Sequence, residues 1–341
     1  MAPKLLDGLF RELADWIEIP SVTGEEGDYG DALQRALERR GFSVERQTVG
    51  PGRFNLLARA GEPDVVFCTH LDTVPPFFPS RMDRTHMHGR GACDAKGQVA
   101  AMLSAAEQLL ARGEDRIGFL LTVGEEEDSD GAAFANIHRP SPWPGRFVII
   151  GEPTDNTFVS AHKGIVKGHL KACGVAGHSS QRVGPSAIHE LVTVCARLLE
   201  SDWGHDVDLG PGTLNLGTIG GGVASNVVAP AAQAELMVRS VEPSERVLER
   251  VRALLGEHVS LDATSKATEP VHFEVPAGEA SQVVAFGTDA PHLTRWGKPI
   301  LFGCGSILDA HTSHEKVEFR SIEECAARHV QTVTELLASG S

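Results

Sequence analysis

The chain has 341 residues and a formal net charge of −15, with 46 Asp plus Glu against 31 Lys plus Arg. This balance excludes the basic surface that binding to nucleic acid or to an anionic membrane requires. The hydrophobic fraction of 41% is enough for a buried core, and the length predicts two domains.

The first half of the chain alternates helical and strand patterns. An amphipathic helix is expected at 3–18, with one apolar face formed by Leu5, Leu6, Leu9, Leu13 and Trp16. Further helices are expected at 29–40, at 97–112 and after Asp130, and short strands at 43–47, 54–59, 64–68, 117–123 and 146–150. This alternation predicts an α/β layer sandwich with a largely parallel sheet.

The middle of the chain follows a different pattern. Strands expected at 167–175, 213–218, 232–240 and near 270–274 alternate with helices at 185–201 and 242–259. Their order, βαββαβ, is that of a ferredoxin-like unit. We therefore predict an α/β domain formed by residues 1–164 and 272–341, into which an α+β domain of residues 165–271 is inserted.

The cysteines and the N-terminus indicate where the protein acts. The six cysteines form no CxxC pair and mostly lie in apolar surroundings, which favours buried free thiols in a reducing cytoplasm. Charged residues on a helical period argue against a signal peptide, and no apolar run approaches the ~18 residues of a membrane span. We expect a cytoplasmic protein with no nucleic-acid or membrane partner.

Histidines and carboxylates recur where the strands of the α/β domain end. His70 and Asp72 follow the apolar run 65–68, and because strand side chains alternate, both leave it on the same side. Further polar residues at strand ends or helix starts are Asp94, Glu125, Glu126, Glu127, Glu152, Asp309 and His311. Ligand sites in open α/β sheets gather at the carboxyl ends of strands, and mixed imidazole and carboxylate ligands suit a pair of Zn²⁺-like ions.

Five motifs carry a resemblance to a known family. They are His70-Leu-Asp-Thr-Val-Pro, Gly89-Arg-Gly-Ala-Cys-Asp94-Ala-Lys-Gly, Thr122-Val-Gly-Glu125-Glu126, Ile150-Gly-Glu152-Pro-Thr and Ala310-His311-Thr-Ser-His-Glu315. In this order they resemble the co-catalytic zinc aminoacylases and exopeptidases, which include acetylornithine deacetylase, succinyl-diaminopimelate desuccinylase and glutamate carboxypeptidase. The resemblance spans nearly the whole chain and implies a zinc-peptidase-like α/β/α catalytic domain with an inserted ferredoxin-like lid.

The resemblance implies roles for the residues at the strand ends. Asp94 would bridge two Zn²⁺ ions per subunit, for which Co²⁺ can substitute, and the Asp94–Ala95 peptide would be cis. His70 would share one ion with Glu126 or with Glu152, and the remaining carboxylate would join His311 on the other; the motif order leaves this pairing open. Glu125 would be the general base and Asp72 would hydrogen-bond His70.

The resemblance also implies roles for residues in and beside the lid. His178 in Gly177-His-Ser-Ser would reach the active site of a partner subunit in a homodimer and stabilise the oxyanion. Asn226 and Arg239 would grip the substrate carboxylate, and Gly287 and Thr288 would line the substrate pocket. The segment 276–286 is short, so a helix of larger relatives is expected to be absent there.

Some roles have competitors in the sequence. Glu127 is an alternative base to Glu125, and His314 is an alternative ligand to His311. The His86–His88 pair has the spacing of a metal site, but we interpret it as part of a variable surface strand.

The predicted function is a dimetal hydrolase that removes the acyl group from a small N-acyl amino acid. Motifs outside the metal ligands are most similar to acetylornithine deacetylase, an enzyme of arginine biosynthesis. Alternatives are a dipeptidase or carboxypeptidase of the same fold and a deacylase of acetylcitrulline, acetyl-lysine or succinyl-diaminopimelate. A catalytically silent, dimeric binding homologue is the non-enzymatic alternative, although such a protein would be expected to have lost the base or a ligand.

Overall fold

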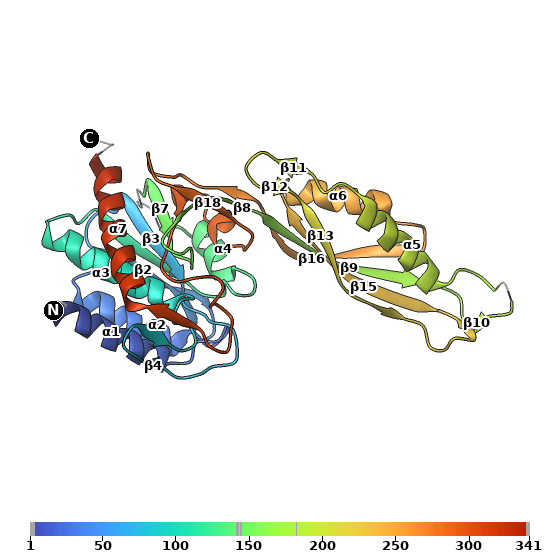
Figure 1. Ribbon diagram of the computed structural model, residues 1–341, viewed down its shortest axis with the longest axis horizontal. Helices are drawn as coiled ribbons and strands as arrows, with labels where there is room; N and C mark the ends of the chain where they lie inside the picture. Colours follow the sequence, from blue (N-terminus) through green and yellow to red (C-terminus); the bar gives the residue numbers. More distant parts are fainter. Residues whose placement is uncertain (1–3, 141–142, 144, 182, 339–341) are drawn as a thin grey trace. The chain divides into compact units, whose positions relative to one another are not determined.

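The computed structural model describes residues 4–140, 143, 145–181 and 183–338. Leu5 and Leu6, which were expected on the apolar face of the first helix, lie outside the residues whose side chains the structure describes. The chain forms two compact units (Figure 1). Unit 1 consists of Met1–Ser160, Phe273–Gln282 and Thr288–Ser341, and unit 2 consists of Ala161–His272 and Val283–Gly287.

A nine-stranded sheet has the order β1-β2-β6-β3-β7-β19-β8-β17, and β18 pairs with β8. Its strands are β1 (Ser43–Gly50), β2 (Arg53–Arg59), β3 (Val65–His70), β6 (Ile117–Thr122), β7 (Phe147–Ile150), β8 (Phe158–His162), β17 (Val271–His272), β18 (Ser281–Val284) and β19 (Lys298–Leu301). The neighbouring strands β6, β3, β7 and β19 are parallel. The expectation of a largely parallel sheet was wrong at its edges, because the two-residue connection between β1 and β2 permits only antiparallel pairing.

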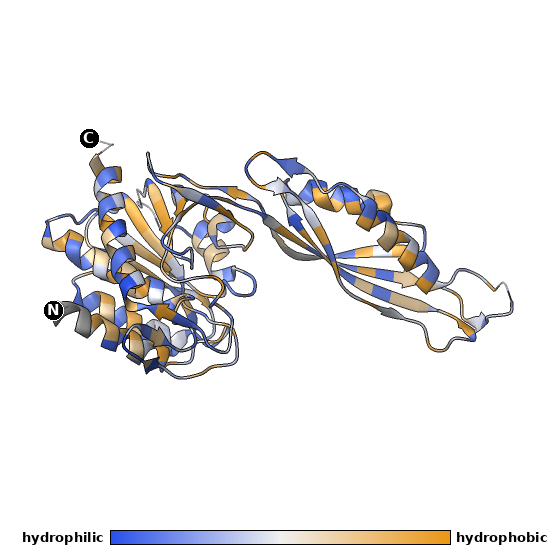
Figure 2. Cartoon of the chain, viewed as in Figure 1, coloured by the Kyte–Doolittle hydropathy of each residue, from blue (hydrophilic) through white to orange (hydrophobic). Residues whose placement is uncertain are grey.

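The central strands are buried along their whole length. Every residue of β3 and β6 is buried, which matches their continuous apolar sequences, and Figure 2 shows the apolar character of the middle of this sheet. The helices of unit 1 are α1 (Lys4–Ile17), α2 (Gly27–Arg39), α3 (Lys96–Ala111), α4 (Asp130–Ile137), the short 3₁₀ helix η1 (Ala290–His292) and α7 (Phe319–Ala338). Helix α3 packs against α1 and α7, and α2 packs against β1 and β2. The expectation of an α/β fold is confirmed.

Unit 1 also contains a small antiparallel sheet. Its order is β20-β5-β4, with β4 (Arg81–Met82), β5 (His86–His88) and β20 (Lys316–Glu318). Lys316 pairs with His88 in this sheet, so the segment that follows His311 is tied to the segment that precedes Asp94.

Unit 2 is built on a four-stranded antiparallel sheet of order β13-β15-β9-β16. Its strands are β9 (Gly164–Cys173), β13 (Thr213–Gly221), β15 (Ala231–Ser240) and β16 (Val259–Thr268). Burial alternates along β9 and β15, because α5 (Ala187–Glu200) and α6 (Ser244–Leu254) cover only one face (Figure 1). Unit 2 also contains two short antiparallel strand pairs. Strand β10 (Gly177–His178) pairs with β14 (Val227–Val228), which is distant in sequence, and β11 (His205–Asp206) forms a short hairpin with β12 (Gly210–Pro211).

The end of unit 2 differs from the expected elements. The helix expected at 242–259 ends at Leu254, where Leu255 turns extended and Gly256 follows. The last strand of the four-stranded sheet is β16 rather than the strand near 270–274, because apolar Val259 and Leu261 alternate with polar residues. Val271–His272 pairs with β8, a strand that the sequence did not indicate.

The sequence led us to expect no helix within 276–286 and no membrane-spanning helix. Within 276–286 these residues form no helix, and Ser281–Val284 is strand β18. Of the helices in the described ranges, none is both long enough and apolar enough to cross a bilayer.

Candidate active site

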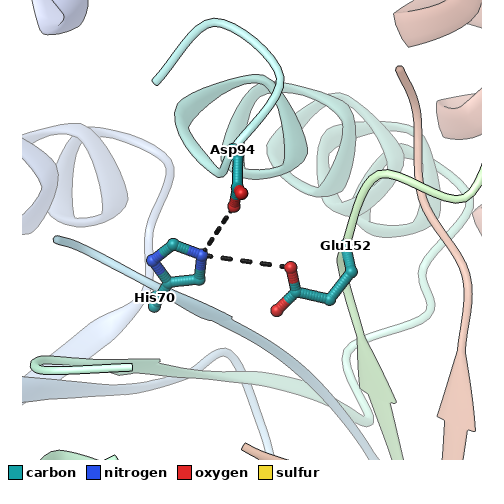
Figure 3. A group of neighbouring side chains, drawn as sticks. All are labelled: His70, Asp94 and Glu152. Carbon is teal, nitrogen blue, oxygen red and sulfur yellow. Dashed lines mark hydrogen bonds and ion pairs between the residues drawn. The ribbon is translucent and has the colours of Figure 1, made fainter. Parts of the chain in front are cut away.

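Three parallel strands bring their polar ends to the same edge of the large sheet. His70 is the last residue of β3, Glu125 and Glu126 follow the end of β6, and Glu152 follows the end of β7. Asp94 reaches the same edge from the loop before α3. Figure 3 shows the side chains of His70, Asp94 and Glu152 pointing toward one another.

Asp94 lies between two groups of possible metal ligands. Its Oδ1 lies 2.9 Å from His70 Nε2, and that nitrogen lies 4.0 Å from Glu152 Oε2. Its Oδ2 lies 3.3 Å from His311 Nε2, which is 2.9 Å from Glu126 Oε2. The carboxylate thus presents one oxygen to each group. The geometry groups His70 with Glu152 and Glu126 with His311, a pairing that the motif order had left open.

The two groups fit a pair of zinc-like cations. A tetrahedral ion with bonds of about 2.0–2.1 Å spaces its ligand atoms by roughly 3.3 Å, and the four separations given above bracket that value. Imidazole with carboxylate is also the donor set that such ions take. Hydrogen bonds that the His311 ring donates to the Asp94 and Glu126 carboxylates raise the pKa of His311 to about 10, so the negative charge gathered here favours a cation. In such a site the ion would take the place of that proton.

The orientation of His70 is fixed by its other ring nitrogen. His70 Nδ1 lies 3.0 Å from the carbonyl oxygen of Asp72 and 3.4 Å from its carboxylate Oδ1. A proton on Nδ1 that is donated to Asp72 leaves Nε2 unprotonated for a metal. The contact with the carbonyl oxygen is the shorter one, which refines the expected side-chain contact.

The Asp72 carboxylate has a second task, which the sequence did not indicate. Its Oδ1 accepts the backbone N–H of Glu125 and its Oδ2 accepts that of Glu126, both at 3.1 Å. The hydroxyl of Thr23 also donates to Oδ2, at 2.8 Å. Asp72 therefore ties the end of β3 to the loop that presents Glu125 and Glu126.

Glu125 stands beside the two ligand groups without belonging to either. Burial and the neighbouring Glu152 raise the pKa of its carboxyl well above the usual range. A carboxyl group in such surroundings suits proton transfer, because a catalytic acid or base works best with a pKa near the working pH. Glu127, the competing candidate, is exposed to solvent.

The other competitors belong to neither of these groups. His314 is exposed, and the groups found among the described residues contain His311 and not His314. His88 Nε2 lies 2.8 Å from a carboxylate oxygen of Asp83, on the small β20-β5-β4 sheet. The Asp94–Ala95 peptide is cis, as the resemblance implied.

Asp289 is a buried carboxylate near the site that sequence reasoning missed. Its Oδ2 accepts a hydrogen bond from Thr122 Oγ1 at 2.7 Å, at the end of β6. It directly follows the expected pocket residues Gly287 and Thr288, of which Thr288 is buried and accepts the backbone N–H of Ala290. Its position next to Thr288 was the only available signal, since an isolated acid in a loop has no pattern.

The expected residues of unit 2 fall into two places. His178 and Asn226 lie together, because the backbone N–H of Ser179 donates to the Asn226 carbonyl and His178 pairs with Val227. Both side chains are exposed. Arg239 lies near the other end of β15, opposite Ile165 and Thr213. Its side chain is half-buried, and within the described part of the chain its guanidinium has no hydrogen-bond or ion-pair partner.

Comparison with known proteins identifies the family. Residues 66–335 match the model of peptidase family M20/M25/M40. The chain is 36% identical to a peptidase M20 domain-containing protein of Schizosaccharomyces pombe, over 93% of this chain and 82% of that protein. It is 35% identical to a probable carboxypeptidase of Aspergillus flavus, over 90% of this chain and 85% of that protein. An aminopeptidase, PepT from Bacillus cereus, has the same fold, with a TM-score of 0.80, 20% identity and coverage of 95% and 97% of the two chains.

The chain therefore belongs to peptidase family M20/M25/M40. Together with the paired ligand groups around Asp94, this membership makes it a metal-dependent hydrolase of amide bonds, as the sequence predicted.

Proposed function

We propose that this member of the family is a dimetal exopeptidase or aminoacylase that hydrolyses the amide bond next to a free carboxylate. Its substrate would be a small N-acyl amino acid or a short peptide that loses its C-terminal residue. The observation that carries the proposal is the Asp94 carboxylate, which offers one oxygen to each of two His-carboxylate groups. Zn²⁺ is the proposed metal, with Co²⁺ as a substitute.

The proposed chemistry divides between the cations and the Glu125 side chain. When bound, a pair of such ions supplies Lewis acidity that polarises the scissile carbonyl and makes water a better nucleophile. Glu125 accepts the proton of the attacking water and passes it to the leaving amine. Its backbone is held by Asp72, which also positions His70, so the proposed base and one metal ligand share a support.

Arg239 is the proposed recognition site for the substrate carboxylate. Burial lowers the pKa of Arg239, and no described acidic side chain balances its charge. A half-buried guanidinium without a partner is costly, and it becomes favourable when it forms a bidentate pair with a carboxylate. The family membership and this unpaired cation both support a substrate with a free carboxyl terminus.

The position of His178 and Asn226 supports a homodimer. They lie beside β14, just before the start of β15, whereas Arg239 is eight residues into that strand. At about 3.3 Å per residue the two places are separated by roughly 26 Å within one unit 2. A dipeptide spans only about 7 Å. The three residues can therefore contact one substrate only if Arg239 comes from one chain and His178 with Asn226 from another.

The surface of unit 2 is suited to a second copy. Helix α5 buries Leu191 and Val194 but exposes Ile188, Val192 and Leu199, which are 37%, 50% and 61% exposed and share one side of the helix. The neighbouring strand β13 is an edge of the four-stranded sheet. Exposed apolar side chains beside an open strand edge are typical of an association surface.

The ring of His178 is prepared for oxyanion binding. Its Nδ1 accepts the backbone N–H of Ser180 at 3.2 Å, which places the ring proton on Nε2. Nε2 can therefore donate a hydrogen bond to the charge that develops on the carbonyl oxygen in the transition state. We propose that His178 does so in the partner's active site.

The remaining candidate functions differ in the amino acid that is released from the substrate. The similarity to a probable carboxypeptidase favours release of a C-terminal amino acid. The motifs Gly177-His-Ser-Ser and Gly287-Thr-Asp-Ala-Pro instead favour acetylornithine deacetylase, which remains the second candidate and would place the enzyme in arginine biosynthesis. Glu125 and all five ligand positions are present, which argues against a silent binding homologue.

A substrate panel on zinc-loaded protein tests the proposal. It contains N-acetylornithine, N-acetylcitrulline, N-acetyl-lysine, succinyl-diaminopimelate, several dipeptides and the same dipeptides with an amidated C-terminus. We expect hydrolysis of at least one free carboxylate substrate, no hydrolysis of its amidated form, and loss of turnover after chelation. A preference for dipeptides would remove the deacetylase assignment, and equal turnover of amidated substrates would refute carboxylate recognition.

A further inference from the structure

We propose that Glu315, which belongs to neither ligand group, is a positioning residue that holds Asp94 in its bridging orientation. The inference rests on the proposed function, because it takes Asp94 as the ligand shared by two cations. It assigns a task to a side chain that contacts two backbone N–H groups, the Arg90 guanidinium and the Cys93 thiol.

The first observation is the pair of hydrogen bonds that Glu315 makes with the Asp94 loop. Its Oε1 accepts the backbone N–H of Cys93 and that of Asp94 itself, each at 3.2 Å. The side chain is completely buried. On the other side of Asp94, the carbonyl oxygen of Ala95 accepts the N–H groups of Gln98 and Val99 at the start of α3. The Asp94 backbone is thus held from both directions.

The second observation is the partner of the other carboxylate oxygen. Arg90 Nη1 donates to Glu315 Oε2 at 2.6 Å, and only 2% of the Arg90 residue is exposed. Arg90 Nε also donates to the Pro76 carbonyl, and its guanidinium lies 4.8 Å from the centre of the Phe78 ring. The arginine is therefore fixed in place, and it fixes the rotation of the Glu315 carboxylate.

The third observation is where Glu315 stands in the chain. It follows His311 by four residues, and its own carbonyl accepts the backbone N–H of Gly89 at 3.1 Å. One residue therefore connects the segment that carries His311 to the loop that carries Asp94. Both residues belong to one ligand group, so the distance between their donor atoms depends on this connection. Partners behind metal ligands commonly change metal affinity 10–100-fold when they are removed.

Stability alone is a poor explanation for a buried Glu–Arg pair. Taking both charges out of water offsets most of their attraction, and apolar replacements of similar volume are often neutral or stabilising. A neutral apolar residue at position 315, however, could not accept the two N–H groups of the loop. The acceptor, rather than the charge pair, is what the Asp94 loop needs.

Two double variants separate the acceptor from the charge pair. Arg90→Met with Glu315→Gln removes both charges but keeps an amide oxygen where Oε1 stands. Arg90→Met with Glu315→Met also removes both charges and takes the acceptor away. Zn²⁺ affinity is measured on the chelated full-length proteins by competition with a chromophoric chelator, and thermal unfolding of the metal-free proteins checks that both fold.

The affinity of interest is that for the Zn²⁺ proposed between Asp94, Glu126 and His311. We expect the dissociation constant of the Gln variant to be within about threefold of that of the parent. The Met variant should bind this ion at least tenfold more weakly. Equal affinity in the Met variant and the parent would overturn the proposal, and so would equal losses in both variants. If the Met variant does not fold, Glu315→Asp gives the same test, because it keeps the charge but draws the oxygen back by about 1.5 Å. A parent protein that binds no divalent ion would refute the proposed function instead.

Discussion

Three of the proposed ligands in unit 1 and the candidate residues of unit 2 lie in different surroundings. In unit 1, His70, Asp94 and Glu152 are buried and contact one another, and their loops are fixed by further buried side chains. In unit 2, His178 and Asn226 are exposed, and Arg239 has no partner among the described residues. In the proposed function, the first set binds cations. The second set contacts a substrate and residues of a second chain.

The largest effect is expected where unit 1 performs the chemistry. Glu125→Gln should lower kcat by about 10²–10⁴-fold, because the amide keeps the shape of the side chain but cannot accept a proton. Zn²⁺ content should remain that of the parent, since Glu125 belongs to neither ligand group. Steady-state kinetics with elemental analysis measures both.

Glu127→Gln is the matched control for this variant. Glu127 is two residues further along the same loop and is exposed, so the control should retain nearly the full rate. If the Glu127 variant lost activity while the Glu125 variant stayed within about tenfold of the parent, the assignment of the base would be wrong.

In unit 1 the sequence could predict which residues stand at strand ends, but not how their side chains are paired. The strand-end positions of His70, Glu126 and Glu152 followed from apolar runs that stop at polar residues, and parallel pairing then brought them together. The pairing of ligands depends on the direction of the Asp94 carboxylate, which no periodicity encodes. The contact of Glu315 with Asp94 joins positions 221 residues apart, so no local pattern indicates it.

In unit 2 the order of elements was predictable, but the last strand was not. The strands expected at 167–175 and 232–240 correspond to β9 (Gly164–Cys173) and β15 (Ala231–Ser240). The helix before β16 was extended too far because Val251, Leu255 and Val259, each four residues apart, fit a helical apolar period. What the sequence could indicate of the lid residues came from the family resemblance, since exposed residues such as His178 leave no burial pattern.

The second prediction tests whether unit 2 acts on a partner. His178→Ala should lower kcat by about 10²–10³-fold, the usual cost of one oxyanion donor. In a heterodimer of His178→Ala and Glu125→Gln chains, one active site would contain both an intact Glu125 and an intact His178. Mixed and verified heterodimers should therefore recover up to half of the parent activity, measured against either inactive homodimer.

A control in the same unit is His189→Ala on α5. His189 is exposed like His178 but stands on helix α5 and belongs to neither β10 nor β14, so its loss should leave kcat unchanged. Absence of recovery in verified heterodimers would mean that His178 acts within its own chain or has no catalytic role, and the comparison between the units would lose its explanation.

The third prediction concerns the unpaired guanidinium. Arg239→Met should raise KM by about 10–100-fold for a free carboxylate substrate, because a charge-assisted hydrogen bond contributes about 1.5–3 kcal/mol. An amidated substrate lacks the carboxylate, so parent and variant should bind it equally weakly. The measurement is a thermodynamic cycle of four inhibition constants, for the acid and for the amide with the parent and with the variant. An equal loss of affinity for the acid and the amide would show that Arg239 does not contact the carboxylate.

The smallest effect is expected from a buried histidine of unit 1 that lies outside the ligand groups. His329 is completely buried between the rings of Phe67 and Phe302, with centroid distances of 5.3 and 5.1 Å, and Nε2 lies 3.4 Å from Cys325 Sγ. Burial lowers the pKa of His329 to about 3, whereas the unfolded chain has a histidine pKa of about 6.5. Between these values the unfolded state binds a proton that the folded state excludes, so stability falls as the pH falls.

The expected slope is at most about 1.4 kcal/mol per pH unit, which gives about 2 kcal/mol between the histidine pKa and about pH 5. His329→Leu should remove this contribution and leave the titration of the ligand carboxylates unchanged. The free energy of unfolding is therefore measured with urea for parent and variant at about pH 7 and pH 5. The contribution of His329 is the amount by which the parent loses more stability than the variant between these two pH values. Parallel losses in the two proteins would mean that the interior of unit 1 tolerates a charged imidazole, and the contrast between a closed unit 1 and an open unit 2 would then hold only for the ligand groups.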